Sequence, residues 1–170
     1  MKSVLPPPKP SGLPADKIRK FAEALSKALR LKPGASLKPI VERLKGTLVK
    51  KEPEPGASCI EVQEDEKFTI FLSTSNFPLE ERFTIAHELG HLFLHSLLPK
   101  RPIKAEHSRA KENEDAEIEA HEFARAFLVP EKDLREAVAK IGPDSLAVAA
   151  HFMVPQQVVL QRMKAIGLIQ

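Results

Sequence analysis

The sequence has a single cysteine, no tryptophan, no tyrosine and no long apolar run. With Cys59 alone, no disulfide can form within the chain, which favours a reducing, cytoplasmic setting. Residues 1–10 include basic residues but no apolar signal-peptide core, and no segment approaches the roughly 20 apolar residues of a membrane-spanning helix. The length of 170 residues suffices for one domain with a real core, and 15 prolines predict many short elements separated by turns.

The net charge of +3 hides an uneven distribution along the chain. Residues 1–51 contain 13 Lys and Arg against 3 Asp and Glu, which gives +10, whereas the remainder contains 13 against 20, which gives −7. A basic N-terminal third could attract nucleic acid or an acidic partner. We favour the simpler interpretation, in which these lysines and arginines form a solvated helical face.

The stretch from Arg82 to His95 carries the strongest pattern in the chain. A helix there would be apolar on nearly every side, which predicts that it is buried. Its polar side chains recur at steps of three or four and so form one stripe: Thr84, His87, Glu88, His91 and His95. Buried ionisable groups need strong partners. His87 and His91, one turn apart with Glu88 beside them, match the H-E-x-x-H arrangement of zinc hydrolases and predict a zinc metallopeptidase.

A catalytic zinc ion needs a third protein ligand, with one position left for water. The metzincin pattern would require glycine at position 94 and histidine at position 97, and both are leucine. The ligand must therefore come from another segment, and the acidic helix that follows residue 113 is the natural source. On a helical wheel Glu117 falls on the apolar side of that helix, whereas Glu119 lies at the opposite margin. Glu117 is the predicted third ligand and Glu119 the reserve.

The same residues resemble a known family. The stretch R-F-T-I-A-H-E-L-G-H at residues 82–91, followed by E-I-E-A-H-E-F-A-R-A-F-L-V-P at residues 117–130, resembles the ImmA/IrrE-type metallopeptidases. In that family the first glutamate of an E-x-x-x-N motif is the zinc ligand, which implies this role for Glu117. The usual asparagine is His121 here, one turn beyond Glu117, so the surroundings of the metal ligands are expected to differ more than the ligands themselves.

The expected mechanism follows from zinc chemistry. His87, His91 and Glu117 would hold Zn²⁺, which lowers the pKa of bound water from 15.7 to about 7. Glu88 would accept the proton of that water and pass it to the leaving amine. A further donor to the developing oxyanion is often tyrosine or histidine, and without tyrosine the candidates are His95, His107 and His121. Gly90 costs about 1 kcal/mol in a helix interior, so we expect another segment to approach closely behind it.

The expected fold is α+β. A small, mostly antiparallel sheet of about three strands (residues 47–50, 58–62 and 67–72) would pack on a zincin-like helical core. The strand at 67–72 is the candidate edge strand that could hold a substrate peptide. We expect a flexible proline-rich tail at 1–14, the zinc metallopeptidase domain at 15–142, and a C-terminal helical hairpin at 143–170 packed on the same domain. Residues 99–113 are expected to form a loop.

The C-terminal hairpin has a helix-turn-helix appearance, with its turn at Met153 and Val154. It could read DNA from the second helix, but that helix is only weakly basic, so a packing or partner-binding role is favoured. The family resemblance implies that the substrate is a regulatory protein, a helix-turn-helix repressor encoded nearby. The alternative is a binding protein with a structural metal, in which the hairpin and the basic N-terminal third contact DNA.

Overall fold

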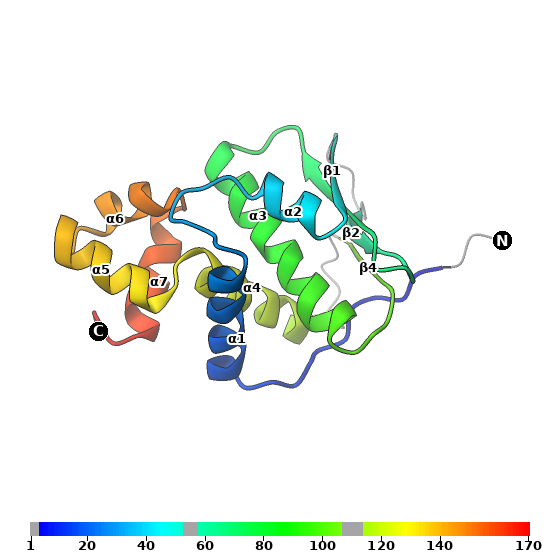
Figure 1. Cartoon of the computed structure of the whole chain (residues 1–170), viewed down its shortest axis with the longest axis horizontal. Coiled ribbons are helices and arrows are strands. Elements are labelled where there is room, and N and C mark those ends of the chain that lie inside the picture. The colour runs from blue at the N-terminus through cyan, green and yellow to red at the C-terminus, as the bar shows by residue number, and fades with distance from the viewer. Residues whose placement is uncertain (1–3, 53–57, 107–113) are drawn as a thin grey trace.

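We describe a computed structural model of the chain over residues 4–52, 58–106 and 114–170. Within these ranges a four-stranded sheet lies at one end of a helical body (Figure 1). The strands are β1 (Gly46–Lys51), β2 (Ser58–Val62), β3 (Phe68–Ser73) and β4 (Ile103–Glu106). The helices are α1 (Ala15–Ala28), α2 (Lys38–Arg43), α3 (Pro78–His91), α4 (Glu114–Leu128), α5 (Glu131–Ile141), α6 (Ser145–Phe152) and α7 (Gln156–Ala165). A π-helical turn, η1 (Leu92–Leu97), continues α3.

The sheet corrects two expectations. Its strand order is β1-β3-β2-β4, so it has four strands rather than about three, and β3 lies inside the sheet rather than at its edge. The pairs β2–β3 and β2–β4 are antiparallel, whereas β1 pairs with β3 in parallel. The edge strand β4 falls in the segment 99–113, for which the two prolines and many charges predict a loop. Ile103 and Ala105 are buried, and this alternation over only four residues was too short to detect.

Helix α3 is buried because apolar side chains surround most of its circumference. Ile85, Ala86 and Leu89 are at most 6% exposed, and they belong to the same core as Ile60 and Ile70 of the sheet. Helix α4 packs on its other side. A Cβ on Gly90 would lie 3.1 Å from both Cα and the carbonyl oxygen of Ala120, so the absence of a side chain lets the two helices approach closely. The predicted close approach behind Gly90 is confirmed.

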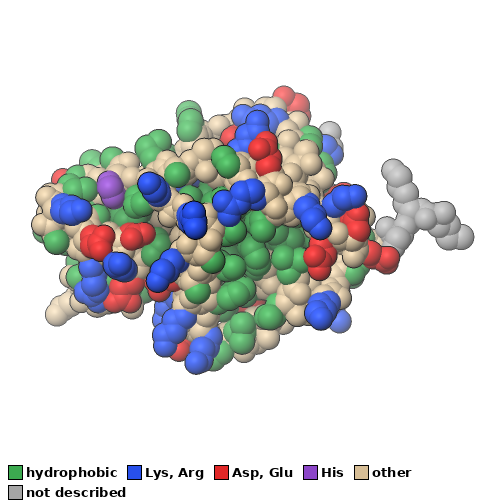
Figure 2. All heavy atoms as spheres, viewed as in Figure 1, with side chains coloured by type: hydrophobic (Ala, Val, Ile, Leu, Met, Phe, Trp, Pro, Cys, Tyr) green, Lys and Arg blue, Asp and Glu red, His purple; other side chains and the backbone are tan. Residues whose placement is uncertain are grey.

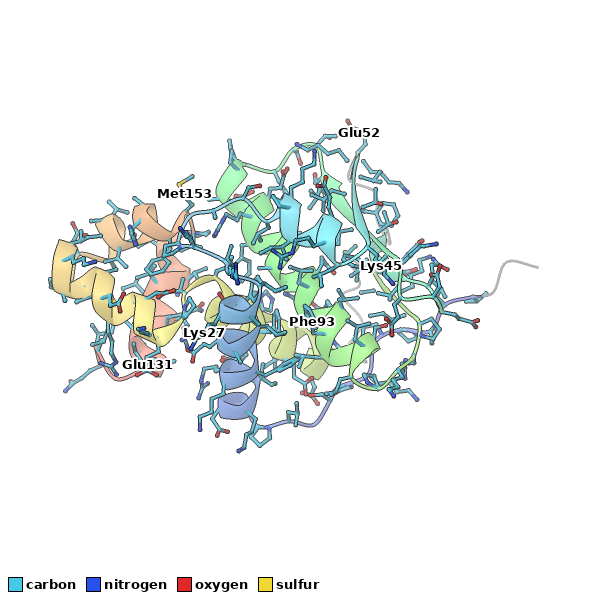
Figure 3. The ribbon with its side chains drawn as sticks, in the orientation of Figure 1. Lys27, Lys45, Glu52, Phe93, Glu131 and Met153 are labelled. Atoms are coloured by element: carbon cyan, nitrogen blue, oxygen red, sulfur yellow. The ribbon has the colours of Figure 1, made fainter. Side chains whose placement is uncertain are left out.

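An aromatic cluster joins α1 to the helices that carry the site. Phe93 of η1 points toward α1 (Figure 3), where its ring meets Phe21 edge-on at 6.2 Å, and it stacks on Phe123 of α4 at 5.9 Å. Such pairs contribute about 0.5–1.5 kcal/mol each beyond the burial of their area. The cluster therefore fixes the C-terminal end of α3 and the middle of α4 with respect to α1.

Helices α5, α6 and α7 form the end of the molecule opposite the sheet (Figure 1). Met153 ends α6 in the left-handed conformation, with φ of 53°, and α7 follows after Pro155. Arg162 of α7 is 1% exposed, donates to the carbonyl oxygen of Val129 at 2.8 Å and pairs with Glu23 of α1. A buried guanidinium with these partners ties α7 to the rest of the helical body. Among the described residues, no helix is long and apolar enough to cross a membrane.

Residues 4–14 form no helix or strand, but hydrogen bonds attach them to the domain. The amide of Lys104 donates to the carbonyl oxygen of Pro6 at 2.8 Å, and Arg101 donates to that of Pro7. Further along, the amides of Ser11 and Gly12 donate to Glu119. The segment that was expected to be a tail therefore runs along the edge strand β4 and past the start of α4.

Candidate metal centre

The polar stripe of α3 is buried as the sequence predicts. His87, Glu88 and His91 are 8%, 3% and 1% exposed, so each loses nearly all of its hydration. The apolar surroundings of α3 leave these groups to find partners among themselves or on the neighbouring helix α4. Helix α4 supplies that partner from its first turn.

The carboxylate of Glu117 contacts both histidines of the motif. Nε2 of His87 lies 2.8 Å from Oε2 of Glu117, and Nε2 of His91 lies 2.9 Å from Oε1. Burial alone would raise the pKa of Glu117, but the two histidines outweigh it and hold that pKa far below its ordinary value. The structure thus brings together the three side chains that the sequence predicts as ligands, and an ionised carboxylate with two imidazole nitrogens is a donor set suited to zinc.

Glu88 lies beside this group without a hydrogen-bond partner for its Oε2 atom among the described residues. Burial raises the pKa of Glu88 to about 7, an effect that His87 opposes and the charge of Glu117 reinforces. A buried carboxyl whose oxygen lacks a protein partner is able to bind a water molecule. A pKa near neutrality suits a group that both accepts and returns a proton.

His121 borders the same group from the next turn of α4. Its ring centroid lies 4.4 Å from that of His87. The ring also stacks on that of Phe83, with 5.8 Å between the two centroids. Although the residue as a whole is exposed, its ring packs against His87 and Phe83, and this local loss of hydration lowers its pKa to about 4, so the ring is neutral near pH 7. One ligand atom each of His87, Glu117 and His121 lie within 4.8 Å of one another, so this trio, which does not include His91, could hold a metal ion.

These side chains open into a pocket of about 260 Å³. Most of the polar stripe of α3 lines this pocket, and the edge strand β4 contributes Ala105 and Glu106. Cys59 of β2 also lines the pocket, where burial raises the pKa of its thiol well above its usual range, so the thiol stays protonated. A strand edge beside a metal-ligand cluster is a surface on which an extended peptide can add by backbone hydrogen bonds.

Comparison with known proteins agrees with this arrangement. The model of a peptidase family described as the IrrE N-terminal-like domain matches residues 47–164, which is more than half of the chain. The chain belongs to this family. It is also similar to Metallopeptidase ImmA of Bacillus subtilis, with 33% identity over 108 residues. That match covers 62% of this chain and 63% of the relative, so the chain spans less than two thirds of the relative's length.

A solved structure gives a further likeness in fold. A Mycobacterium tuberculosis transcriptional regulator superposes with a TM-score of 0.63 at 20% identity, covering 88% of this chain and 46% of that one. At this identity the likeness concerns the fold. Its coverage extends beyond the part matched by the peptidase family, so the mixed α and β arrangement of nearly the whole chain occurs in another protein.

The structure separates two of the histidines that were considered as oxyanion donors, His95 and His121. His95 is fully buried, and its ring nitrogens contact His91 and Glu119, which turns it away from the pocket. His107 lies outside the described residues. His121 lines the pocket. Of the described candidates, His121 is therefore the one placed to meet a substrate.

Glu119, the reserve ligand, also belongs to a separate group. Its Oε2 atom lies 2.8 Å from Nε2 of His95 and accepts the amide of Ser11, while Oε1 accepts the amide of Gly12. Sequence reasoning missed this group. The spacing of His95 one turn after His91 was a usable signal, but nothing in the sequence places residues 11 and 12 near α4.

Proposed function

We propose that the chain is a zinc-dependent metallopeptidase that cleaves a regulatory protein. The observation that carries the proposal is the contact of one carboxylate, that of Glu117, with both histidines of the H-E-x-x-H motif. The unpartnered carboxyl of Glu88 lies beside them in the same pocket. Membership of a peptidase family supports the same conclusion.

His87, His91 and Glu117 are the proposed ligands, and His121 is not. His91 is held from behind through its Nδ1 atom by His95, which leaves Nε2 facing Glu117. His121 is an exposed residue that lines the pocket and stacks on Phe83. A ligand that is buried and oriented by a second residue loses less entropy on binding a metal than an exposed ring does.

Zinc, when bound, would lower the pKa of a water molecule and polarise the peptide carbonyl. Glu88 would accept the proton of the attacking water and return it to the leaving amine. His121, neutral near pH 7, would donate a ring N–H to the carbonyl oxygen as negative charge develops there. These assignments give a role to each ionisable side chain of α3 and α4 that lines the pocket.

The edge strand β4 would bind the substrate, in place of the strand first expected to do so. Ala105 and Glu106 line the pocket, so a peptide added along this part of β4 would pass beside the cluster of His87, His91 and Glu117. The outer edge at Lys104 is already bonded to Pro6. The substrate segment would therefore pair with β4 at Ala105 and Glu106.

The proposed substrate is a helix-turn-helix repressor encoded beside this chain, as the resemblance to the ImmA/IrrE-type peptidases implies. The test is to incubate the purified chain and one equivalent of Zn²⁺ with that repressor and to follow fragments by mass spectrometry. The Glu88→Gln variant serves as the control. Fragments that form with the wild type and not with the variant would support the proposal.

The rival hypothesis, a DNA-binding protein with a structural metal, finds less support on the visible surface. Figure 2 shows Lys and Arg side chains spread over one face with Asp and Glu between them, rather than one continuous basic surface. Arg162 lies on α7, the second helix of the hairpin that would read DNA, and it is buried against Glu23. A gel-shift measurement at physiological salt that found DNA affinity, together with no repressor cleavage, would favour the rival.

A further inference from the structure

Four side chains form a continuous line of contacts that begins at the proposed metal site. Oε1 of Glu117 lies 2.9 Å from Nε2 of His91, and Nδ1 of His91 lies 2.9 Å from Nδ1 of His95. Nε2 of His95 then lies 2.8 Å from Oε2 of Glu119. Both rings are at most 1% exposed, so water does not compete for their nitrogens.

The hydrogens available to this line determine its direction. Each of the three contacts needs one ring hydrogen, because an ionised carboxylate only accepts. Two neutral imidazoles carry two ring hydrogens, which is one fewer than required. A cation at Nε2 of His91 removes the need for a hydrogen there. The remaining two are then fixed: His91 donates from Nδ1 to His95, and His95 donates from Nε2 to Glu119.

Glu119 is oriented in turn by the backbone of residues 6–12, which we call the N-terminal strap. The amide of Ser11 donates to Oε2 at 2.8 Å and the amide of Gly12 donates to Oε1 at 3.0 Å. Gly12 has φ of 74°, a left-handed conformation that glycine adopts at little cost. With His95, three donors surround the carboxylate, so it acts as a fixed acceptor.

The strap is itself attached to the strand that borders the pocket. Pro6 and Pro7 accept hydrogen bonds from Lys104 and Arg101, at the start of β4. Figure 1 shows the dark-blue coil running from beside β4 to the start of α1. The strap and the start of β4, nearly a hundred positions apart in the sequence, are thus joined beside the site.

We propose that Glu119 and His95 are positioning residues for the metal ligand His91, and that the N-terminal strap holds Glu119 in place. The proposal rests on the proposed function for the metal. Hydrogen-bonded carboxylates behind ligand histidines fix the ring tautomer and orientation, and their loss typically weakens metal binding by about 10–100-fold. Here the carboxylate acts through a second imidazole, and its own orientation depends on the start of the chain.

The test compares zinc affinity in matched variants by competition with a chromophoric chelator. Glu119→Gln keeps the shape of the side chain but replaces one carboxylate oxygen by an NH₂ group. That group donates and therefore cannot accept the hydrogen bond of His95 or of the strap amides. Glu122→Gln is the same change one turn away, on a carboxylate whose partners are Arg19 and Arg125. Deletion of residues 1–12 removes the strap amides, whereas deletion of residues 1–4 keeps every bond described above.

We expect Glu119→Gln and the deletion of residues 1–12 to weaken zinc binding about 10–100-fold, and the two controls to change it less than about twofold. In the zinc-loaded wild type, imidazole ¹⁵N spectra should show hydrogen on Nδ1 of His91 and Nε2 of His95, a pattern that Glu119→Gln should change. Wild-type affinity and spectra in Glu119→Gln would overturn the inference, whatever the deletion does to folding. Zinc binding without cleavage of the repressor would instead contradict the proposed function alone.

Discussion

Glu117 and His91 meet at 2.9 Å across the interface of α3 and α4, although 26 positions separate them in the sequence (117 − 91). Gly90 makes this approach possible, because its bare Cα lies against the backbone of Ala120, three residues beyond Glu117. The packing of the two helices therefore places the predicted third ligand. The chemistry of the site depends on that contact.

Replacing Glu117 with alanine should abolish stoichiometric zinc binding. A catalytic zinc site has three protein ligands, and Glu117 is the only carboxylate that contacts both histidines among the described residues. Glu119→Ala should retain zinc, with reduced affinity, because Glu119 contacts His95 and reaches the ligand His91 only through that ring. Metal content after dialysis, measured by atomic emission for both variants, checks the prediction. Loss of zinc in Glu119→Ala alone would reverse the assignment of the ligand.

Replacing Glu88 with glutamine should leave zinc bound and remove peptide cleavage. The amide has nearly the same shape but cannot accept the proton of the attacking water, and general-base catalysis typically contributes about 10²–10⁴-fold. Cleavage rate and zinc content measured on the same preparation separate the two effects. Cleavage at the wild-type rate would show that Glu88 is not the base.

The burial of the polar stripe of α3 could be predicted from the sequence because its signal is local. His87, Glu88 and His91 lie within five residues of one helix, and burial of that helix follows from the apolar residues around it. The prediction of Glu117 needed one more step, which was to decide which face of a second helix is turned toward the core. Each of these inferences uses a period of 3.6 residues, which a single sequence displays directly.

The parts that the sequence did not reveal depend on pairings between distant segments. Strand β4 has only four residues and follows two prolines, so its alternation carries little weight against the loop signal. The parallel partnership of β1 with β3 places β3 inside the sheet, and no local pattern distinguishes an inner strand from an edge strand of this length. The bonds of Ser11 and Gly12 to Glu119 use backbone amides, which every residue except proline possesses.

Changes at His121 should distinguish an oxyanion donor from a metal ligand. His121→Phe keeps a ring to stack on Phe83 but removes the N–H, so we expect kcat to fall about 10²–10³-fold, as for other oxyanion donors. Zinc affinity should stay within about twofold of the wild type. His121→Asn restores an N–H donor and should recover part of the rate. A large loss of zinc affinity in His121→Phe would instead make His121 a ligand.

A methyl group at Gly90 should separate α3 from α4. In an exposed helix, Gly→Ala stabilises by about 1 kcal/mol, but here the new Cβ would lie 3.1 Å from the Ala120 backbone, which cannot move aside. Overpacking of this kind costs about 1–3 kcal/mol. We expect Gly90→Ala to lower both the free energy of unfolding and the zinc affinity. Urea denaturation and chelator competition measure the two, and a gain in stability would contradict the predicted close packing.

Glu88→Gln should also stabilise the metal-free protein, and more so as the pH rises. Burial raises the pKa of Glu88 from its ordinary 4.5 to about 7. Because the folded state then binds the proton more tightly than the unfolded state, the free energy of unfolding falls between about pH 4.5 and 7 and stays lower above that range. The difference in pKa corresponds to roughly 3 kcal/mol at most. Glutamine carries no charge and escapes this penalty.

Urea denaturation with a chelator present should find the variant more stable than the wild type at pH 8 and nearly equal at pH 5. An equal gain at both pH values would show that the charge of Glu88 is not what destabilises the site.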